Sequence, residues 1–250
     1  MISIAIDLGN TNQKVALYNG DLNVATGIFA RLSPAILQNF IDQHSPNSGP
    51  PTSAILATVV DIQGELLQYL KTNYHFIQLK AGLPLPIEIE YKTPQTLGSD
   101  RIAAAVAASN RAGACASLSI TAGSCIIYDF VDQHKVYHGG AISPGLEMRM
   151  KALNTFSKKL PLVTAQPFDD LIGRTTNESI LSGVLNGIAH EIDGFIDNFR
   201  QKYPEIIVFM SGGDLNYFDK RLKNNIFAVP NLVLEGLNKI ILFNENHQQV

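Results

Sequence analysis

A short apolar run, a polar glycine turn and a second apolar run occur twice in this chain, and this repeated layout constrains the fold most. The first copy is ISIAIDLGNTNQKVALYNG at 2–20, and the second is SLSITAGSCIIYDFVD at 117–132. In each copy two β-rich runs flank the turn, which is the pattern of adjacent strands. The copies share a layout more than identical residues. They predict two related halves that meet near residue 113.

The rest of the chain alternates between strand and helix patterns, which is typical of an α/β layered fold. Residues 33–44 show the clearest helix start, with Ser33 as the N-cap and Pro34 at the first helical position. The other expected helices are 61–73 (capped by Asp61), 96–113, the helix after the glycine-rich turn in 139–156, 175–203 and 229–244 (capped by Asn231). The other expected strands are 54–60, 75–80 and the first part of the strand, turn and helix at 205–218.

The longest predicted helix covers residues 175–203 and has clear signals at both ends. Thr175 and Glu178 form the sequence signature of a capping box, and Pro204 ends the helical pattern. Apolar residues from Ile180 to Phe195 recur on one stripe, as expected of a helix that packs on a core.

Composition and charge exclude several classes of protein. The chain has 250 residues, which is enough for one large domain or two packed halves with a sizeable core. A net charge of −3 provides no field that would attract nucleic acid or an anionic membrane. Two cysteines fit neither a disulfide framework nor a metal cluster and are expected to be reduced. The N-terminal apolar run breaks at Asp7, so we expect no signal peptide, no membrane helix and a cytoplasmic location.

The first glycine turn carries residues that suit an anion. Gly9, Asn10 and Thr11 offer donors in a tight turn, and Lys14 adds a positive charge. Asp7 would face phosphates, which requires a bridging cation. Taken alone, the turn is explained equally well as a plain β-turn. Similar turns at 121–124 and 211–214 strengthen the case, and the three together favour a nucleoside triphosphate.

A second group of polar residues opens the predicted helix at 96–113. Gly98 and Ser99 start this helix, and Asp100 and Arg101 follow directly. An acidic residue in a first helical turn commonly does no more than complement the helix dipole. Alternatively, the carboxylate and guanidinium could deprotonate a substrate hydroxyl while holding a carboxylate or amide. The residues alone leave both interpretations open, and a neighbouring phosphate site favours catalysis.

Several motifs, in their order and spacing, resemble type III pantothenate kinases over nearly the whole chain. They are DLGNTNQK, GSDRIAAAVAA, GGAISPGLEMRMKAL, LIGRTTNESILSGVLNG, SGGD and PNLVLEGLN. The resemblance implies the acetate and sugar kinase/Hsp70/actin fold, an α/β fold with two duplicated ribonuclease-H-like halves and the nucleotide cleft between them. The halves would cover 1–113 and 114–250, the second including a dimerisation helix. It also implies ATP-dependent phosphorylation of pantothenate, the first step of coenzyme A synthesis, by a homodimer that uses Mg²⁺ and a monovalent cation (K⁺ or NH₄⁺).

The resemblance also assigns roles to individual residues. Asp100 would be the general base that takes the proton from the pantothenate hydroxyl. Thr176 would reach pantothenate in the site of the partner subunit. The residues that would bind pantothenate beside Asp100 are Tyr91, Gly98, Ser99 and Arg101. The residues that would contact the phosphates of ATP are Asp7, Leu8, Gly9, Asn10, Thr11, Asn12, Gln13, Lys14 and Ser124.

One position departs from the family pattern. The second phosphate motif of the family usually reads Asp-x-Gly-Thr, and its Asp binds the monovalent cation. This chain has Thr121-Ala122-Gly123-Ser124, so Ser124 keeps the hydroxyl and Thr121 lacks the negative charge. A hydroxyl and nearby carbonyls bind K⁺ more weakly than a carboxylate does. Thr121 therefore keeps open an alternative, a catalytically weakened relative that acts as a regulatory or binding protein.

The remaining polar residues are interpreted as structural. His134 and His138 are expected in a surface loop between strands, and His190 on the long helix is expected to be structural. Glu147 and Arg149 are expected on a solvated helix face. A third interpretation, another small-molecule kinase of the same fold, is weakened by the Gly-Ser-Asp-Arg loop.

Overall fold

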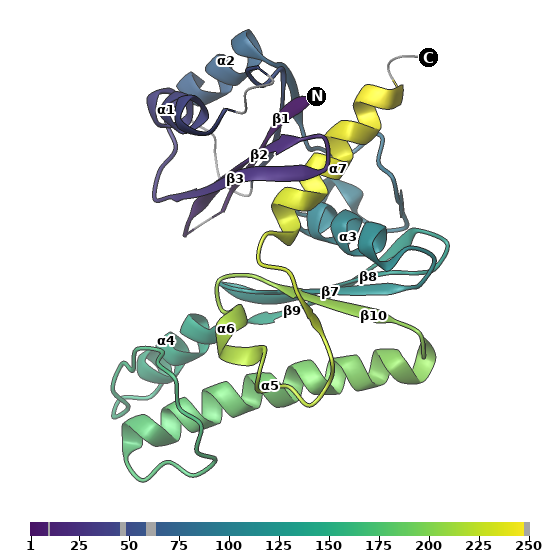
Figure 1. Ribbon diagram of the computed structural model, residues 1–250. Coiled ribbons are helices and arrows are strands. Elements are labelled where there is room, and N and C mark those ends of the chain that lie inside the picture. Colours follow the sequence, from purple (N-terminus) through teal and green to yellow (C-terminus); the bar gives the residue numbers. More distant parts are fainter. Residues whose placement is uncertain (10, 46–48, 59–63, 248–250) are drawn as a thin grey trace. The chain divides into compact units, whose positions relative to one another are not determined.

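The computed structural model describes residues 1–9, 11–45, 49–58 and 64–247 (Figure 1). The chain forms two compact units. Unit 1 comprises residues 1–111, 135–138 and 231–250, and unit 2 comprises residues 112–134 and 139–230. The C-terminal segment therefore belongs to the same compact unit as the N-terminal part of the chain. The halves predicted from sequence, 1–113 and 114–250, describe a duplication of the chain, and that division stays a prediction.

Unit 1 is built on a five-stranded sheet with the order β3-β2-β1-β4-β5. Its strands are β1 (Ile2–Leu8), β2 (Gln13–Asn19), β3 (Leu22–Phe29), β4 (Ser53–Thr58) and β5 (His75–Gln78). β1 and β2 form the predicted antiparallel pair, and β1 also runs parallel to β4. β3 was not predicted, because its residues are at least partly exposed and it lacks a continuous apolar run.

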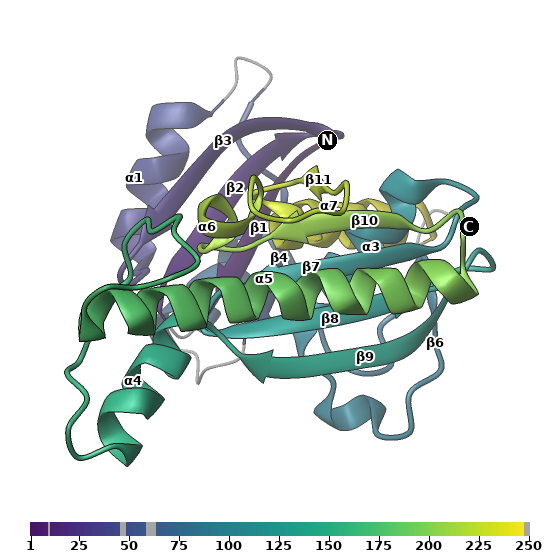
Figure 2. The ribbon, with the colours of Figure 1, turned by 90° about the horizontal axis from the view of Figure 1, so that it is seen from below.

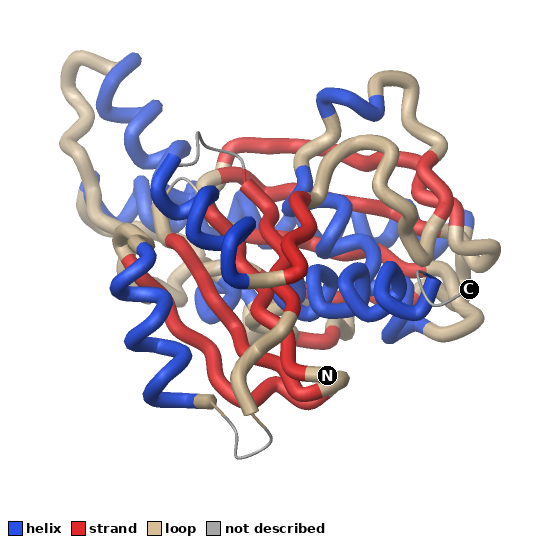
Figure 3. The backbone as a smooth tube through the Cα atoms, turned by 90° about the horizontal axis from the view of Figure 1, so that it is seen from above, coloured by secondary structure: helices blue, strands red, loops and turns tan. Residues whose placement is uncertain are grey.

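Helices cover both faces of this sheet. α1 (Pro34–His44) and α2 (Gly64–Asn73) lie on one face, the layer nearest the viewer in Figure 3. The Ser33 side chain accepts the N–H of Ile36, so the predicted N-cap of α1 is confirmed. The predicted cap of α2, Asp61, lies outside the described residues.

The other face of the unit 1 sheet carries α7 (Leu232–His247), and α3 (Ser99–Ala112) packs against α7. A Cβ at Gly236 would lie 1.8 Å from the carbonyl oxygen of Ala103, so the two helix backbones touch where only glycine fits. Side chains alternate along β1: Ile4 and Ile6 point into the core below α1 and α2, and Ser3 points to α7, where it donates a hydrogen bond to Asn238. Asp7 lies on the Ser3 side of the strand.

The second sheet has the order β11-β10-β7-β8-β9-β6. Its strands are β6 (Glu88–Ile89), β7 (Ser117–Ala122), β8 (Cys125–Val131), β9 (Val136–Pro144), β10 (Ile207–Ser211) and β11 (Phe227–Ala228). The predicted strand, turn and strand at 117–132 is confirmed as the antiparallel pair β7 and β8. The other elements are η1 (Pro94–Thr96), α4 (Leu146–Phe156), α5 (Thr176–Lys202) and α6 (Leu215–Phe218).

α5 covers one face of the sheet in unit 2 (Figure 2). Its predicted capping box is present: Thr175 accepts the N–H of Glu178, and the Glu178 carboxylate accepts the N–H of Thr175. Ile188 and Ile192 on its apolar stripe are fully buried against β7 and β8. Helix propensity, capping and periodicity agree in this segment, which explains why it was predicted almost to the residue.

Three expectations for residues 134–149 were wrong: the glycine-rich turn, the loop position of His138 and the solvated position of Arg149. The predicted glycine-rich turn is the second half of β9, and His138 lies on that strand, where it pairs with Glu90 at 2.8 Å. A Cβ at Gly140 would lie 1.6 Å from the carbonyl oxygen of Tyr128, so glycine lets β9 approach β8 closely there. Arg149 is not on a solvated face, because its guanidinium is paired with Glu191. Within the described ranges no helix has the length and apolarity needed to cross a membrane.

Candidate active site

An acidic and a basic residue face each other across β1 and β2 where the two strands meet their turn. Asp7 and Lys14 are direct partners in the antiparallel register, and Asp7 is only partly exposed at the end of its strand. A Cβ at Gly9 would lie 3.1 Å from the carbonyl oxygen of Asn12, so the turn is tight but open on its outer side. Thr11 and Asn12 are exposed there, whereas Asn10 lies outside the described residues. This geometry leaves the outer side of the turn accessible to a ligand.

Gln13 has a structural contact in this turn. Its side-chain oxygen accepts the N–H of Leu32, just before α1. Leu32 is buried, so Gln13 ties the first turn to the core beneath α1. Gln13 is one of the nine residues expected to contact ATP, and its side chain holds the turn in place.

The start of α3 is fixed to the sheet of unit 1 by a side chain. The Ser99 hydroxyl accepts the N–H of Thr58 at 3.1 Å and donates to the Thr58 carbonyl at 3.2 Å. Thr58 ends β4 and is the parallel partner of Leu8, the last residue of β1. Ligands of α/β sheets bind at the carboxyl ends of parallel strands. Ser99 thus brings the first turn of α3 to that edge of the sheet.

Asp100 follows Ser99 and occupies a crowded position. Its Oδ1 accepts the N–H of Arg101 at 2.9 Å. A Cβ at Gly98 would lie 2.5 Å from the same Oδ1, so a larger residue there would displace the carboxylate. The position of the Asp100 carboxylate therefore requires glycine at residue 98, whether or not a substrate binds there.

Asp7 and Asp100 lie near each other in unit 1, and their charges interact. Burial raises the pKa of Asp7 to about 6, with a further contribution from the negative charge of Asp100, while Lys14 acts in the opposite direction. Two neighbouring carboxylates repel each other when both carry a negative charge, and a bound cation would offset this repulsion. This electrostatic environment fits a cation that accompanies phosphate groups.

Tyr91 lies between two side chains of unit 1. The guanidinium carbon of Arg101 is 5.9 Å from the centre of the Tyr91 ring, and the ring of Tyr137 is 6.1 Å away on centroids. Tyr137 is fully buried, and its carbonyl accepts the N–H of Glu90 at 2.9 Å. The segment that carries Tyr91 is thereby held by β9, and Tyr91, Arg101 and Asp100 lie in one region.

In unit 2, the turn between β7 and β8 is enclosed by two other glycine segments. A Cβ at Gly145 would lie 1.9 Å from the carbonyl oxygen of Gly123, and one at Gly212 would lie 2.0 Å from that of Ala122. The N–H of Gly145 donates to Ser124, and the N–H of Asp214 donates to Ala122, both at 3.1 Å. The glycine-bearing segments at 145 and 212 thus converge on this turn.

Thr121 and Ser124 occupy different places in that turn. Ser124 is exposed at the turn itself. Thr121 is partly exposed and points away from α5, because its neighbours Ile120 and Ala122 point into the core. The nearby Asp214 has a pKa raised to about 6 by burial and by the charge of Glu147.

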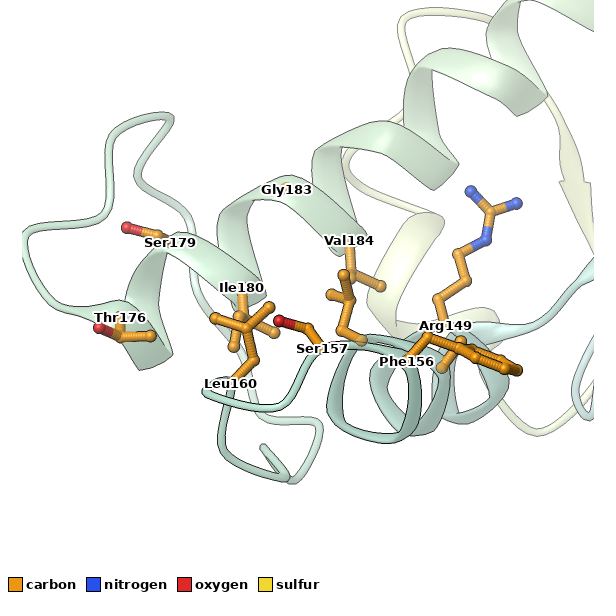
Figure 4. A pocket seen from close by; sticks show the side chains of 11 residues that line it. Arg149, Phe156, Ser157, Leu160, Thr176, Ser179, Ile180, Gly183 and Val184 are labelled. Atoms are coloured by element: carbon orange, nitrogen blue, oxygen red, sulfur yellow. The ribbon is translucent and has the colours of Figure 1, made fainter.

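Thr176 lies at the start of α5, on the wall of an apolar pocket of about 790 Å³ between α4 and α5 (Figure 4). Leu160, Ile180 and Val184 form part of its lining, and the ring of Phe156 stands at its edge. Phe156 is 88% exposed, an unusual state for so large an apolar side chain. This face of unit 2 has the character of a surface that another molecule covers.

Sequence reasoning missed three contributors to these sites. Thr58 ends a strand and carries no pattern of its own, and Tyr137 lies in a segment that was expected to be a loop. Glu191 looks like an ordinary polar position on a long helix. Among the described residues, no group of three or more His, Cys, Asp or Glu side chains could hold a metal ion by itself.

Solved structures define the class of this fold. A hexokinase of the ROK group from Thermus thermophilus aligns over 98% of this chain and 100% of its own, with a TM-score of 0.53 and 12% identity. The activator of the 2-hydroxyisocaproyl-CoA dehydratase from Clostridium difficile aligns over 100% and 98%, with a TM-score of 0.55 and 12% identity. At such identities the likeness concerns the fold alone. The chain shares the α/β fold of these proteins, which is the actin-like fold that the motifs predicted.

Sequence comparison then defines the family. The family model described as type III pantothenate kinase matches residues 3–198. A type III pantothenate kinase of Christiangramia forsetii is 41% identical over 98% of this chain and 99% of its own length. One of Bacteroides fragilis is 42% identical over 97% and 98%. The chain belongs to the type III pantothenate kinase family, as the motifs predicted, and none of these findings supports the alternative of a regulatory protein.

Proposed function

We propose that this chain transfers the γ-phosphoryl group of ATP to the hydroxyl of pantothenate, forming 4'-phosphopantothenate, the first step of coenzyme A synthesis. The observation that supports this most directly is the position of Asp100. In a member of this kinase family, Ser99 holds that carboxylate at the sheet edge where β1 and β4 end, close enough to Asp7 for their charges to interact.

Asp100 is the proposed general base. A carboxylate next to a substrate hydroxyl accepts its proton as the oxygen attacks the phosphorus atom. Arg101 would pair with an acidic or amide group of pantothenate, and Tyr91 would lie over its chain, supported by its tilted ring contact with Tyr137. Gly98 keeps the Asp100 carboxylate in its place. Positioning and charge neutralisation supply most of the catalysis of phosphoryl transfer.

The first turn, from Asp7 to Lys14, and Ser124 of the second turn are the proposed phosphate contacts. Backbone N–H groups of glycine turns suit phosphate oxygens, and Lys14 adds a positive charge. Asp7 would hold Mg²⁺, and its raised pKa fits this role because a cation would relieve the repulsion by Asp100. When bound, Mg²⁺ neutralises charge on the phosphates.

A monovalent cation would be held at Thr121 through the hydroxyl and neighbouring carbonyls. These are neutral oxygen ligands, so we propose weaker activation by K⁺ or NH₄⁺ than a carboxylate would give.

We propose a homodimer that covers the pocket between α4 and α5. Exposed apolar side chains gather in this part of unit 2, around the exposed Thr176, at Met148, Phe156, Leu162, Leu171 and Ile172. In a two-fold dimer each patch covers the same patch of its partner. In this dimer we propose that Thr176 contacts the pantothenate of the partner subunit, as the family resemblance implies. A cytoplasmic location and the lack of a nucleic-acid partner stay predictions.

The test is incubation of the purified protein with Mg-ATP and pantothenate, with and without K⁺, followed by mass detection of 4'-phosphopantothenate. We expect product that depends on both substrates. Absence of product under every cation condition would overturn the proposal.

A further inference from the structure

Glu191 of α5 is the centre of a polar network that joins four elements of unit 2. Its carboxylate accepts hydrogen bonds from the Tyr128 hydroxyl of β8 at 3.0 Å and from the Ser143 hydroxyl of β9 at 2.5 Å. It also accepts one from the Arg149 guanidinium of α4. Both members of the ion pair are about three-quarters buried, with side-chain exposures of 23% and 24% for Arg149 and Glu191.

The same guanidinium holds the junction between β9 and α4. The Nε of Arg149 donates to the carbonyl of Pro144 at 2.8 Å, and a second nitrogen donates to the Ser143 hydroxyl at 3.4 Å. Burial acts to raise the pKa of Glu191, but the hydrogen bonds from Arg149 and Ser143 outweigh it, and the pKa is lowered overall. Glu191 is therefore ionised at neutral pH, and the network is charge-assisted.

This junction directly supports the turn between β7 and β8. Gly145 follows Pro144, and its N–H donates to the carbonyl of Ser124 at 3.1 Å. Its Cα lies so close to Gly123 that a Cβ would approach the carbonyl oxygen to 1.9 Å. A displacement of residues 143–145 would therefore be transmitted to Gly123 and Ser124, because nothing separates the two backbones.

We propose that Glu191 is a positioning residue for the turn at Gly123 and Ser124, acting through Ser143 and Arg149 on the junction that ends at Gly145. This inference rests on the proposed function, in which that turn contacts the phosphates of ATP. Glu191 itself touches no substrate. Its role is to keep the backbone of the turn in the one arrangement that binds phosphate.

The experiment compares E191Q with wild type in the full-length protein. E191Q keeps an acceptor for Tyr128 and Ser143 but loses the charge that pairs with Arg149. The matched control is E205Q, which makes the same change at an exposed residue beyond α5. The Kd for a non-hydrolysable ATP analogue with Mg²⁺ is measured by calorimetry, the KM for pantothenate by ADP release, and the melting temperature by circular dichroism.

We expect E191Q to raise the Kd for the ATP analogue about 5-fold to 10-fold, in line with the loss of a charge-assisted contact, and to change the KM for pantothenate less than about 2-fold. E205Q should match wild type in all three measurements. If Glu191 had only a structural role, the melting temperature would fall and the folded fraction would bind the analogue normally. That result, or an unchanged Kd and melting temperature, would overturn the inference.

A double-mutant cycle tests the route. S143A removes the hydroxyl between Glu191 and the junction, and E191A, unlike E191Q, removes the acceptor of that hydroxyl. The double variant S143A/E191A should therefore weaken binding of the analogue no more than E191A alone does. A loss in the double variant that equals the sum of the two single losses would contradict action through Ser143. The inference and the proposed function fail in different ways. Wild type that binds the analogue but leaves pantothenate unmodified refutes the function alone, and wild type that binds no analogue refutes both.

Discussion

Asp7 at the end of β1 lies in the electrostatic field of Asp100 at the start of α3. Burial and that charge together raise the pKa of Asp7 to about 6 from its ordinary value of 3.8. Above pH 6 the folded protein must hold an ionised carboxylate that the unfolded chain ionises more easily. The contribution of Asp7 to the free energy of unfolding therefore falls progressively as the pH rises from about 4 to 6, and it falls no further above that range.

Replacement of Asp7 by Asn removes this cost. We expect Asp7→Asn to melt about 3–6 °C above wild type at pH 8, allowing for the partial exposure of the side chain, and to show less than half that difference at pH 4. The same variant should lose kinase activity. Melting curves at the two pH values check the prediction, and an equal difference at both would show that the charge of Asp7 is not the cause.

Gly145 is expected to tolerate no side chain. Gly145→Ala places a Cβ 1.9 Å from the carbonyl oxygen of Gly123 and must displace the turn. We expect ATP affinity to fall about tenfold or more. Gly194→Ala, in the middle of α5 with open space around it, is the control and should stabilise the protein by about 0.5–1 kcal/mol. Binding of an ATP analogue that is normal in Gly145→Ala would contradict this account of the turn.

Thr121 is expected to set the response to monovalent cations. Thr121→Asp adds a carboxylate ligand, and we expect activation by K⁺ to strengthen several-fold, on the order of 3-fold to 10-fold. Initial rates measured across a K⁺ titration, with Na⁺ as the control, provide the test. An unchanged K⁺ response would mean that the cation does not bind at Thr121.

Mixed dimers test whether Thr176 acts across subunits. Asp100→Asn and Thr176→Ala subunits, each with its own tag, are co-expressed and purified as the hybrid. If Thr176 serves the partner's site, one site of the hybrid is intact and we expect about half of the wild-type activity. If Thr176 serves its own subunit, both sites carry one defect and activity stays at the level of the parent variants.

The sequence predicted the strand pairs, the capped helices and the glycine turns because local signals dominate there. Ser33 and Thr175 begin helices because their side chains accept hydrogen bonds from backbone N–H groups a few residues later. Pro204 ends a helix because it has no N–H to donate. β9 was missed because its glycines, which weaken a strand pattern, are present for close approach to β8. The Arg149–Glu191 pair, 42 residues apart, depends on tertiary packing that periodicity alone does not encode.

The residues of the candidate site also fall into two groups, those that local motifs predicted and those that only tertiary packing revealed. Asp7, Gly98 and Asp100 belong to compact motifs, and the structure brings them to one edge of the sheet in unit 1. Thr58 and Tyr137 became visible only in the fold, because each acts by contact with a residue far away in sequence. Motifs thus identified the residues proposed for chemistry, and the structure identified the residues that hold them in place.

The most direct test of the central claim is the rate of pantothenate phosphorylation by Asp100→Asn. Asn has the shape of Asp but cannot accept the hydroxyl proton. We expect kcat to fall about 100-fold to 10,000-fold while the Kd for an ATP analogue changes less than about 3-fold. Activity within a factor of about 2 of wild type would contradict the assignment of Asp100 as the general base.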